Sequence, residues 1–416
     1  MDSQHPVWLT CEEGLERSRL TVFFRLLLAL PHIVWFAFWT IGVLFVVIFN
    51  WFATLFTAKP PPFAHRFLTA YARYSTHLAA YVSLTGDKFP DFVGRPGSYA
   101  IDLHLPEEPQ VQNRWKTGFR AILALPAWML DAAFVGGSRS GYSNSGGVLW
   151  TNAFLAWFAC LATGRMPEGL RDLNLYALRY SGQTHAYTLL ITDRYPDADP
   201  FVAPVPEQAP HHPVRLPTGE DDLSRSRLTV FFRILLVIPH LVWLTLWGIA
   251  AFFVVLVGWF ITLFTAQLPE GFHNFLTRYV RYGTHVGAYL LVAGGPFPGF
   301  AGAPGSYPID VDVDPRARQN RWKTGFRLVL AVPAAAVSGA VGTAAFLAAI
   351  FSWWVALITG RMPRNLRQSI LFSLRYSAQL NSYALLLTDR YPFASPAPPA
   401  ASAAPPAVSP AVPVAE

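Results

Sequence analysis

Charged residues are scarce in this chain of 416 residues, where they make up 14% of the sequence. A soluble domain averages about a quarter charged residues. Hydrophobic residues reach 53%, and 15% of all residues are aromatic. A chain with so little charge and so much apolar surface is poorly suited to folding in water, so the composition favours a membrane protein.

Cysteine is nearly absent, because Cys11 and Cys160 are the only two. Two isolated cysteines form neither a metal cluster nor a disulfide framework. The sequence also lacks a Gly-x-Ser-x-Gly elbow, a phosphate loop, a dinucleotide fingerprint and a His-Glu-x-x-His motif. We therefore predict a protein that is not an enzyme and that has no cofactor.

The apolar residues are gathered in long runs with few charges, as in membrane segments. Arginines flank these runs, so the net charge of +7 indicates membrane topology and lipid contact rather than nucleic-acid binding. The predicted partners are membrane lipids, with no nucleic acid. The runs cover residues 20–58, 117–135, 148–163, 228–266 and 324–359.

The chain is an internal duplication whose halves each divide again. Residues 17–25 and 225–233 share the same nine letters, RSRLTVFFR, and residues 112–120 return at 319–327. A pattern of Arg, five residues, Arg, five residues and Pro then occurs four times, so four units share one plan. The second arginine of this pattern is Arg25, Arg120, Arg233 and Arg327.

Each unit is predicted to contain a short strand, a membrane segment and an amphipathic helix. The result is an all-α membrane protein with small β elements. We expect the amphipathic helices to lie in the cytoplasmic interface with Arg and His toward water. The strands are predicted at 6–10, 99–105, 213–216 and 307–313, and the amphipathic helices at 67–84, 170–191, 275–292 and 366–387.

The membrane segment is predicted to be a transmembrane helical hairpin. As one helix, residues 20–58 would be about 58 Å long, roughly twice the hydrocarbon thickness of a bilayer. An interfacial elbow followed by one span, or a shallow hairpin, also fits this length. The polar residues 136–147 interrupt the run of the second unit midway and belong at a turn that reaches water.

Hairpins would place every arginine-rich flank on one side of the membrane, as the positive-inside tendency requires. We therefore predict a multi-pass plasma-membrane protein with cytoplasmic termini, and with residues 136–147 outside. The frequent use of Arg over Lys, and of Ala and Pro, indicates a bacterial source.

The domain organisation follows the repeats. Residues 1–196 form the first tandem repeat and residues 225–393 the second, joined by a linker at 197–224 that is rich in proline and charge. Residues 394–416 are almost wholly Ala, Pro, Ser and Val, and are predicted to be a disordered tail. The predicted units are 5–92, 98–196, 213–300 and 306–393.

The four recurring arginines are the first candidate site residues, because a charge inside an apolar run needs a partner or must reach the interface. They are interpreted either as ligands of lipid head groups or as structural anchors. Candidate acidic partners follow the amphipathic helices at Asp87, Asp193 and Asp389, whereas the third unit has Gly295 at that place.

Histidine and aspartate provide the remaining candidates. His77 and His285 recur in the amphipathic helices, and neutral imidazole is a common metal ligand, but neither histidine lies in a metal motif, so no metal site is predicted. Asp310, Asp312 and Asp314 alternate, which on a strand places them on one face. A solvated strand edge is the preferred interpretation, with a hard-cation site as the alternative.

Three repeated motifs resemble a known family. They are Phe-Arg-x-Leu-Leu-x-x-Pro-His at 24–32 and 232–240, Trp-Phe-x-x-Leu-Phe-Thr at 51–57 and 259–265, and endings in Thr-Asp-Arg-Tyr-Pro at 190–196 and 386–392. They resemble the bacterial membrane proteins grouped as domain of unknown function 4389 (DUF4389), over nearly all of residues 5–393. The resemblance implies tandem copies of one membrane unit, without an assigned activity.

The predicted function is that of a non-enzymatic, integral plasma-membrane protein that interacts with lipid or acts as a scaffold for a membrane complex. A transporter or channel, with a pathway between the repeats, is the first alternative. A membrane enzyme acting on lipid is the second, and it requires a convergent set of His and Asp residues that a sequence alone does not display.

Overall fold

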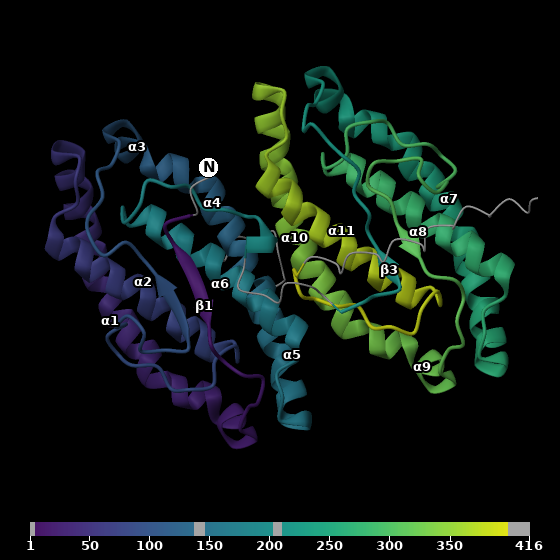
Figure 1. Cartoon of the computed structure of the whole chain (residues 1–416), viewed down its shortest axis with the longest axis horizontal. Coiled ribbons are helices and arrows are strands. Elements are labelled where there is room, and N and C mark those ends of the chain that lie inside the picture. Colours follow the sequence, from purple (N-terminus) through teal and green to yellow (C-terminus); the bar gives the residue numbers. More distant parts are fainter. Residues whose placement is uncertain (1–4, 137–145, 203–209, 398–416) are drawn as a thin grey trace, which may run out of the picture.

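Each unit is built from a long apolar helix and a shorter helix that packs against it. The structure, a computed structural model, describes residues 5–136, 146–202 and 210–397. The first half of the chain lies at the left of Figure 1 and the second half at the right. The helices of units 1 and 3 are α1 (Arg19–Thr57), α2 (Pro62–Val82), α7 (Arg227–Thr265) and α8 (Glu270–Leu290). Those of units 2 and 4 are α3 (Arg114–Gly118), α4 (Arg120–Val135), α5 (Gly147–Thr163), α6 (Glu168–Thr188), α9 (Arg321–Gly325), α10 (Arg327–Thr359) and α11 (Arg364–Ala384).

The long helices have no turn in the middle, so the prediction of helical hairpins is wrong. Helices α1 and α7 each continue for 39 residues, and α10 continues for 33 residues. The prolines of the repeat lie within these helices and do not end them. Two glycines near the middle of α1 and α7 are sites of close packing: a Cβ atom at Gly42 would lie 3.5 Å from Phe67, and one at Gly248 would lie 3.1 Å from the hydroxyl of Tyr279.

Unit 2 contains the same long helix in two pieces. Helices α4 and α5 have 16 and 17 residues, which together equal the 33 residues of α10. A Cβ atom at Gly136 would lie 2.2 Å from the carbonyl oxygen of Gly146, so α5 begins where α4 ends. The predicted outward loop therefore falls at the junction of two helix pieces. Residues 137–145 are outside the described residues.

The two units of each half run in opposite directions. The amide of Gln112, at the start of unit 2, donates to the carbonyl of Ala58 at the end of α1. The amide of Arg17, just before α1, donates to the carbonyl of Gly164 at the end of α5. Since these contacts lie at opposite ends of α1, α4 and α5 must extend along its whole length. Equivalent bonds join units 3 and 4, from Gln319 to Ala266 and from Arg225 to Gly360.

Reciprocal tryptophan contacts reinforce this pairing. The indole N–H of Trp51 donates to the carbonyl of Thr117 in unit 2, at 2.8 Å, and that of Trp157 donates to the carbonyl of Val22 in unit 1, at 3.2 Å. Both carbonyls lie three residues before a recurring arginine. The arginine-rich beginnings of paired units consequently lie at opposite ends of the helix layer. The placement of all these flanks on one side of the membrane no longer follows from hairpins and stays a prediction.

The helices and strands are arranged in three layers. The long helices lie side by side in the order α1, α4 with α5, α10 and α7, and the shorter helices pack behind them. Strands β1 (Trp8–Cys11) and β2 (Ile101–His104) form an antiparallel pair in which Trp8 lies opposite His104. Strands β3 (Val214–Arg215) and β4 (Asp312–Val313) form the matching pair of the second half. A mostly helical protein with a few small strands is therefore confirmed.

The shorter helices are enclosed between the long helices and the strands, so they are not interfacial helices with a charged face toward water. Arg73 and His77 of α2 are buried, and so are Arg281 and His285 of α8. The sequence pattern is amphipathic, but these four side chains are bonded inside the protein. The prediction that Arg and His face water is wrong for them, whereas Arg278 of α8 is exposed.

Parts of the predicted linker and tail are ordered. Arg179 donates to the carbonyl of Asp199, next to the short 3-10 helix Pro200–Val202, and Arg375 donates to the carbonyls of Ser395 and Ala397. The prediction of disorder is therefore wrong for residues 394–397. Residues 203–209 of the linker and 398–416 of the tail are outside the described residues.

Candidate functional sites

Each recurring arginine is buried at the end of the shorter helix of its own unit. Arg25 is 1% exposed, and its guanidinium carbon lies 4.3 Å from the centre of the Tyr81 ring. The same guanidinium donates to the carbonyls of Tyr81 and Gly86 and forms an ion pair with Asp87 at 2.8 Å. Arg25 thus binds one carbonyl group at the C-terminal end of α2 and one just beyond it, where a positive charge is favourable.

Units 2 and 4 repeat this arrangement. Arg120 lies 4.2 Å from the ring centre of Tyr187 and pairs with Asp193 at 2.5 Å. Arg327 lies 4.8 Å from the ring centre of Tyr383 and pairs with Asp389 at 2.7 Å. The suggested acidic partners therefore do lie beside the arginines in these units.

Unit 3 is the exception, as its sequence indicated. Arg233 lies 4.4 Å from the ring centre of Tyr289 and donates to the carbonyls of Tyr289 and Gly294. Gly295 stands where the other units have aspartate, and within the described part of the chain Arg233 makes no ion pair. All four guanidinium groups are buried and bonded within the protein. Their burial favours a structural role for the four arginines over the binding of lipid head groups.

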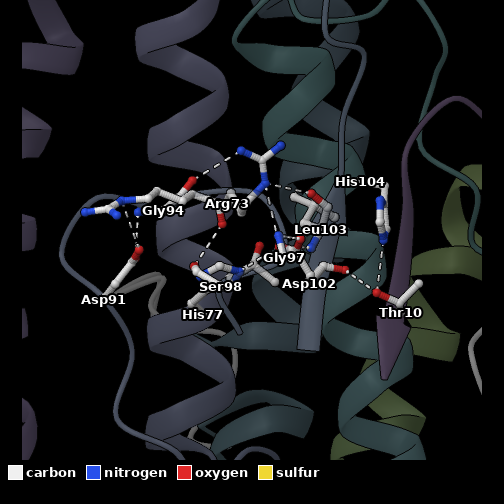
Figure 2. Close-up of polar contacts among 12 residues, drawn as sticks. Thr10, Arg73, His77, Asp91, Gly94, Gly97, Ser98, Asp102, Leu103 and His104 are labelled. Atoms are coloured by element: carbon white, nitrogen blue, oxygen red, sulfur yellow. Dashed lines mark hydrogen bonds and ion pairs between the residues drawn. The ribbon is translucent and has the colours of Figure 1, made fainter. Parts of the chain in front are cut away.

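A second polar cluster joins helix α2 to strand β2. Figure 2 shows Arg73 and His77 of α2 meeting Asp102 of β2. The Nε2 atom of His77 donates to Asp102 Oδ1 at 2.8 Å, and Arg73 Nε lies 3.6 Å from the same oxygen. The backbone N–H of Gly97 donates to Asp102 Oδ2 at 2.7 Å. Since β2 begins unit 2, these residues, which we call the first His-Asp-Arg cluster, join unit 1 to unit 2.

An equivalent cluster joins α8 of unit 3 to the start of unit 4. His285 and Arg281 lie 3.0 Å from Asp310 Oδ1, and the N–H of Gly305 donates to Asp310 Oδ2 at 2.6 Å. Asp310 is buried, so the preferred interpretation of this aspartate as part of a solvated strand edge is wrong. Asp314 is partly exposed and pairs with Arg215 at 2.8 Å.

The environment of the cluster keeps its carboxylates ionised. Burial on its own raises the pKa of Asp102, but the hydrogen bonds from His77 and Gly97 and the charges of His77 and Arg73 bring that pKa below its ordinary value. The pKa of Asp310 is likewise lowered, against the effect of burial, by His285 and backbone N–H groups. The aspartates therefore carry negative charge at neutral pH and fix the strand pair onto the helices.

Neither histidine lies in a metal site. Among the residues that the structure describes, no three His, Cys, Asp or Glu side chains are placed to hold a metal ion. The Nε2 atom of each histidine is hydrogen-bonded to an aspartate. In units 2 and 4 glutamine replaces the histidine, and Gln183 and Gln379 donate to the carbonyls of Val7 and Val214 instead.

Sequence comparison of the repeats had a signal for these clusters that our interpretation missed. His77 and Asp102 are 25 residues apart, and so are His285 and Asp310. The histidine occurs in the shorter helices of units 1 and 3, and the aspartate occurs in the segments that begin units 2 and 4. The shorter helices of units 2 and 4 have glutamine in place of the histidine. Such joint change between repeats indicates contact, whereas we compared each histidine and each aspartate separately.

The outer face of the long helices is apolar, whereas the buried stripe of α1 and of α7 includes several polar residues. On α1 the buried stripe includes Arg25, His32, Asn50 and Thr54. The exposed side has large apolar residues such as Phe45, which is 68% exposed. Helix α7 repeats the pattern, with buried arginine, histidine and threonine and with exposed phenylalanine, leucine and isoleucine. On both helices, this distribution of polar and apolar residues is the reverse of the one on a helix at the surface of a water-soluble protein.

By length and composition, three of the described helices are long and apolar enough to cross a membrane: α1, α7 and α10. The outer face of α1, α4, α5, α10 and α7 is called the apolar face below. A contiguous apolar face of several helices normally marks an interaction with lipid or with another protein.

A family model described as a domain of unknown function (DUF4389) matches the chain at residues 19–94, 142–198, 227–300 and 321–395. The chain belongs to the DUF4389 family. Each of the four DUF4389 matches overlaps one of the four units, so the predicted resemblance and the tandem copies are confirmed. In unit 2 the match begins only at residue 142, near the break between α4 and α5. No match was found among curated proteins or among solved structures.

Proposed function

We propose that this DUF4389 protein is a non-enzymatic membrane protein that engages lipid through its apolar face and acts as a scaffold. The observation that carries the proposal is the reversed distribution on α1 and α7, with apolar side chains outside and polar side chains inside. Each Å² of apolar surface left in water costs about 25 cal/mol. Lipid removes that cost over the whole face.

The length of the apolar face favours helices that lie close to the membrane plane. The exposed apolar residues of α1 extend from Leu20 to Phe56, a distance of about 54 Å along the helix. The hydrocarbon core is about 30 Å thick, so a crossing helix of this length must tilt by about 56° from the normal. Membrane-spanning helices tilt by roughly 0–40°. We therefore propose that the apolar face is embedded in one leaflet, with the strands toward water.

A pair of variants tests lipid engagement. Phe45 and Phe253 occupy equivalent, exposed positions on α1 and α7, and the double variant Phe45→Glu/Phe253→Glu places two charges on the apolar face. We expect this variant to be released severalfold more readily from vesicles of phosphatidylcholine and phosphatidylglycerol by alkaline washing. A charge placed against hydrocarbon costs several kcal/mol, depending on its depth.

The matched control adds two charges elsewhere. Ser98 and Ser306 are exposed residues of the loops before the second strand of each pair, and Ser98→Glu/Ser306→Glu should remain bound like the unaltered protein. Circular dichroism in detergent verifies that both variants fold. Equal retention of the two double variants would contradict the proposal, and solute flux or lipid turnover in the same vesicles would replace it with the transporter or enzyme alternative.

A further inference from the structure

A groove on unit 3 extends from the apolar face to the layer of shorter helices. It has a volume of about 860 Å³ and lies between α7, α8 and the loop that follows α8. Its lining includes Trp243, Leu246 and Trp247 of α7, Arg278 of α8, and Phe300 of the loop. Ligand pockets typically have volumes of about 300–1,000 Å³ and mostly apolar walls with a few polar groups. The groove has that size and that composition.

The groove is apolar on one side and cationic on the other. Trp243 and Leu246 are exposed on the apolar face, and the indole of Trp243 is held by a hydrogen bond to the carbonyl of Phe300 at 3.1 Å. Arg278 is exposed on α8, behind the apolar face, and makes no ion pair with any described residue. The buried indole N–H of Trp247 also has no partner. A ligand that complements these walls has an apolar chain and an anionic end.

Unit 1 shows which residues distinguish the groove. The position of Gly271 is occupied there by Phe63, which lies against Phe49 with 5.5 Å between ring centres, and the position of Arg278 is occupied by Ala70. Unit 1 has Arg66 at the position of Asn274, so each unit has one arginine here, about one helical turn apart, and unit 3 has less side-chain volume beside its arginine. This combination is what a site for an anionic amphiphile requires.

We propose that the groove binds one anionic amphiphile, with its acidic head group at Arg278 and its hydrocarbon chain along Trp243 and Leu246. From the apolar face toward the layer of shorter helices, the groove presents first Trp243 and Leu246 and then Arg278. A lipid in a leaflet has the same order, with its hydrocarbon chain in the membrane and its head group at the surface. The phosphate of a phospholipid and the carboxylate of a fatty acid have the shared chemistry of an anion on an apolar chain. The inference deepens the proposed function, because it names a lipid class and a place for it.

Binding can be measured on the full chain in detergent, without a membrane. Dansyl-labelled phosphatidylglycerol is titrated into delipidated protein, and energy transfer from tryptophan reports binding. We expect Arg278→Gln to weaken binding about tenfold, as for the loss of one charge-assisted contact, and Arg278→Lys to retain most of it. Gly271→Phe should also weaken binding about tenfold by filling the groove. A Cβ atom at Gly271 meets no atom within 4 Å, so this variant is expected to fold.

The control variant is Arg66→Gln, which removes an exposed arginine from α2 of unit 1. It should bind the probe like the unaltered protein. Unlabelled phosphatidylglycerol, oleate and phosphatidylcholine serve as competitors. Displacement by unlabelled phosphatidylglycerol identifies the ligand as a phospholipid, and displacement by oleate alone identifies it as a fatty acid. Either result supports the proposal. Equal displacement by phosphatidylcholine, or unchanged binding in both groove variants, overturns it.

The two proposals fail in different ways. Arg278→Gln and Gly271→Phe leave the apolar face intact, so both variants should still resist alkaline washing from vesicles. Loss of probe binding with retained vesicle association is the expected result. Probe binding in detergent by a protein that does not associate with vesicles would contradict the proposed function and leave the groove as a site.

Discussion

At the scale of single residues, each of the four units buries its recurring arginine, while the long helices expose large apolar side chains. The recurring arginines are each bound by a tyrosine ring and by carbonyl groups at a helix end, and three of the four have an aspartate as well. Sequence comparison located these arginines and their partners because they repeat. It did not reveal that they are buried, since an arginine beside an apolar run suits a membrane surface equally well.

The unpaired arginine of unit 3 gives the first prediction. Gly295→Asp should place a carboxylate beside Arg233, as Asp87 lies beside Arg25 in unit 1. A hydrogen bond to a charged group contributes about 1.5–3 kcal/mol, from which the burial of the new carboxylate subtracts. We expect a net gain of about 1 kcal/mol, seen as a higher unfolding temperature in detergent.

A control variant separates charge from side-chain size. Gly295→Asn has nearly the same volume and no charge, so it should not stabilise the protein. Equal unfolding temperatures for the two variants would show that Arg233 has no need of an acidic partner. A lower temperature for the aspartate variant alone would mean that the carboxylate does not reach the guanidinium.

The His-Asp-Arg clusters predict a dependence of stability on pH. Because the pKa values of Asp102 and Asp310 are lowered in the folded protein, their contribution is fully present above the ordinary aspartate pKa of about 3.9. That contribution is lost as the pH falls through the lowered values. Asp102→Asn/Asp310→Asn should cost about 1–3 kcal/mol per site at pH 7, and the difference from the unaltered protein should shrink below about pH 4.

Thermal unfolding in detergent between pH 3 and pH 7 measures this difference. The control is Asp312→Asn, which removes a partly exposed carboxylate of β4 that has no ion pair among the described residues. It should change the unfolding temperature little at any pH. A difference between the double variant and the unaltered protein that persists unchanged at pH 3 would contradict the linkage.

At the scale of helices and strands, the sequence predicted which segments are regular but not how long each helix runs. The strands and both types of helix lie within or next to the segments that periodicity indicated. The polar residues 136–147 indicate a break in unit 2 alone, because α1, α7 and α10 each continue without one. Gly42 and Gly248 accept side chains of the neighbouring helix, which only the packing of α2 and α8 reveals.

The break in unit 2 gives a prediction about an element. Helix α4, from Arg120 to Val135, matches the first 16 residues of α10, which begins at Arg327. Helix α5, from Gly147 to Thr163, matches the last 17 residues of α10, which ends at Thr359. Removing residues 136–146 should join α4 to α5 as one helix equivalent to α10. We expect an unfolding temperature and a vesicle association close to those of the unaltered protein.

The helical register provides the control for this deletion. Removing residues 136–144 leaves two additional residues, which rotate α5 by about 200° relative to α4 because each residue turns the helix by about 100°. The buried stripe of α5, with Asn152 bonded to Asn174 of α6 at 3.0 Å, would then face away from its partners. The shorter deletion should be destabilised by several kcal/mol, and equal behaviour of both deletions would contradict a continuous helix.

At the scale of the whole molecule, the antiparallel pairing of units sets the available topologies. Because paired units begin at opposite ends of the helix layer, a crossing arrangement puts their arginine-rich beginnings on opposite sides of the membrane. That result opposes the positive-inside tendency. An in-plane arrangement avoids the conflict, since both ends of every long helix then lie at the same depth. The cytoplasmic location of the termini stays a prediction.

Helix orientation in aligned bilayers is therefore the last prediction. In polarised infrared spectra, the amide I band of in-plane helices absorbs most strongly with the electric field in the membrane plane, and the band of crossing helices absorbs most strongly with the field along the normal. Helices α1, α7 and α10 contain 39, 39 and 33 residues, so they make a large contribution to this band. We expect an average tilt above about 60°, beyond the 0–40° of spanning helices.

Cysteine labelling of sealed vesicles at Ser18 and Thr57, the two ends of α1, gives an independent measure, in a background without Cys11 and Cys160. Both positions should be labelled from the same side, because a helix in one leaflet never reaches the other. Labelling from opposite sides, together with a tilt below 40°, would show that the long helices cross the membrane.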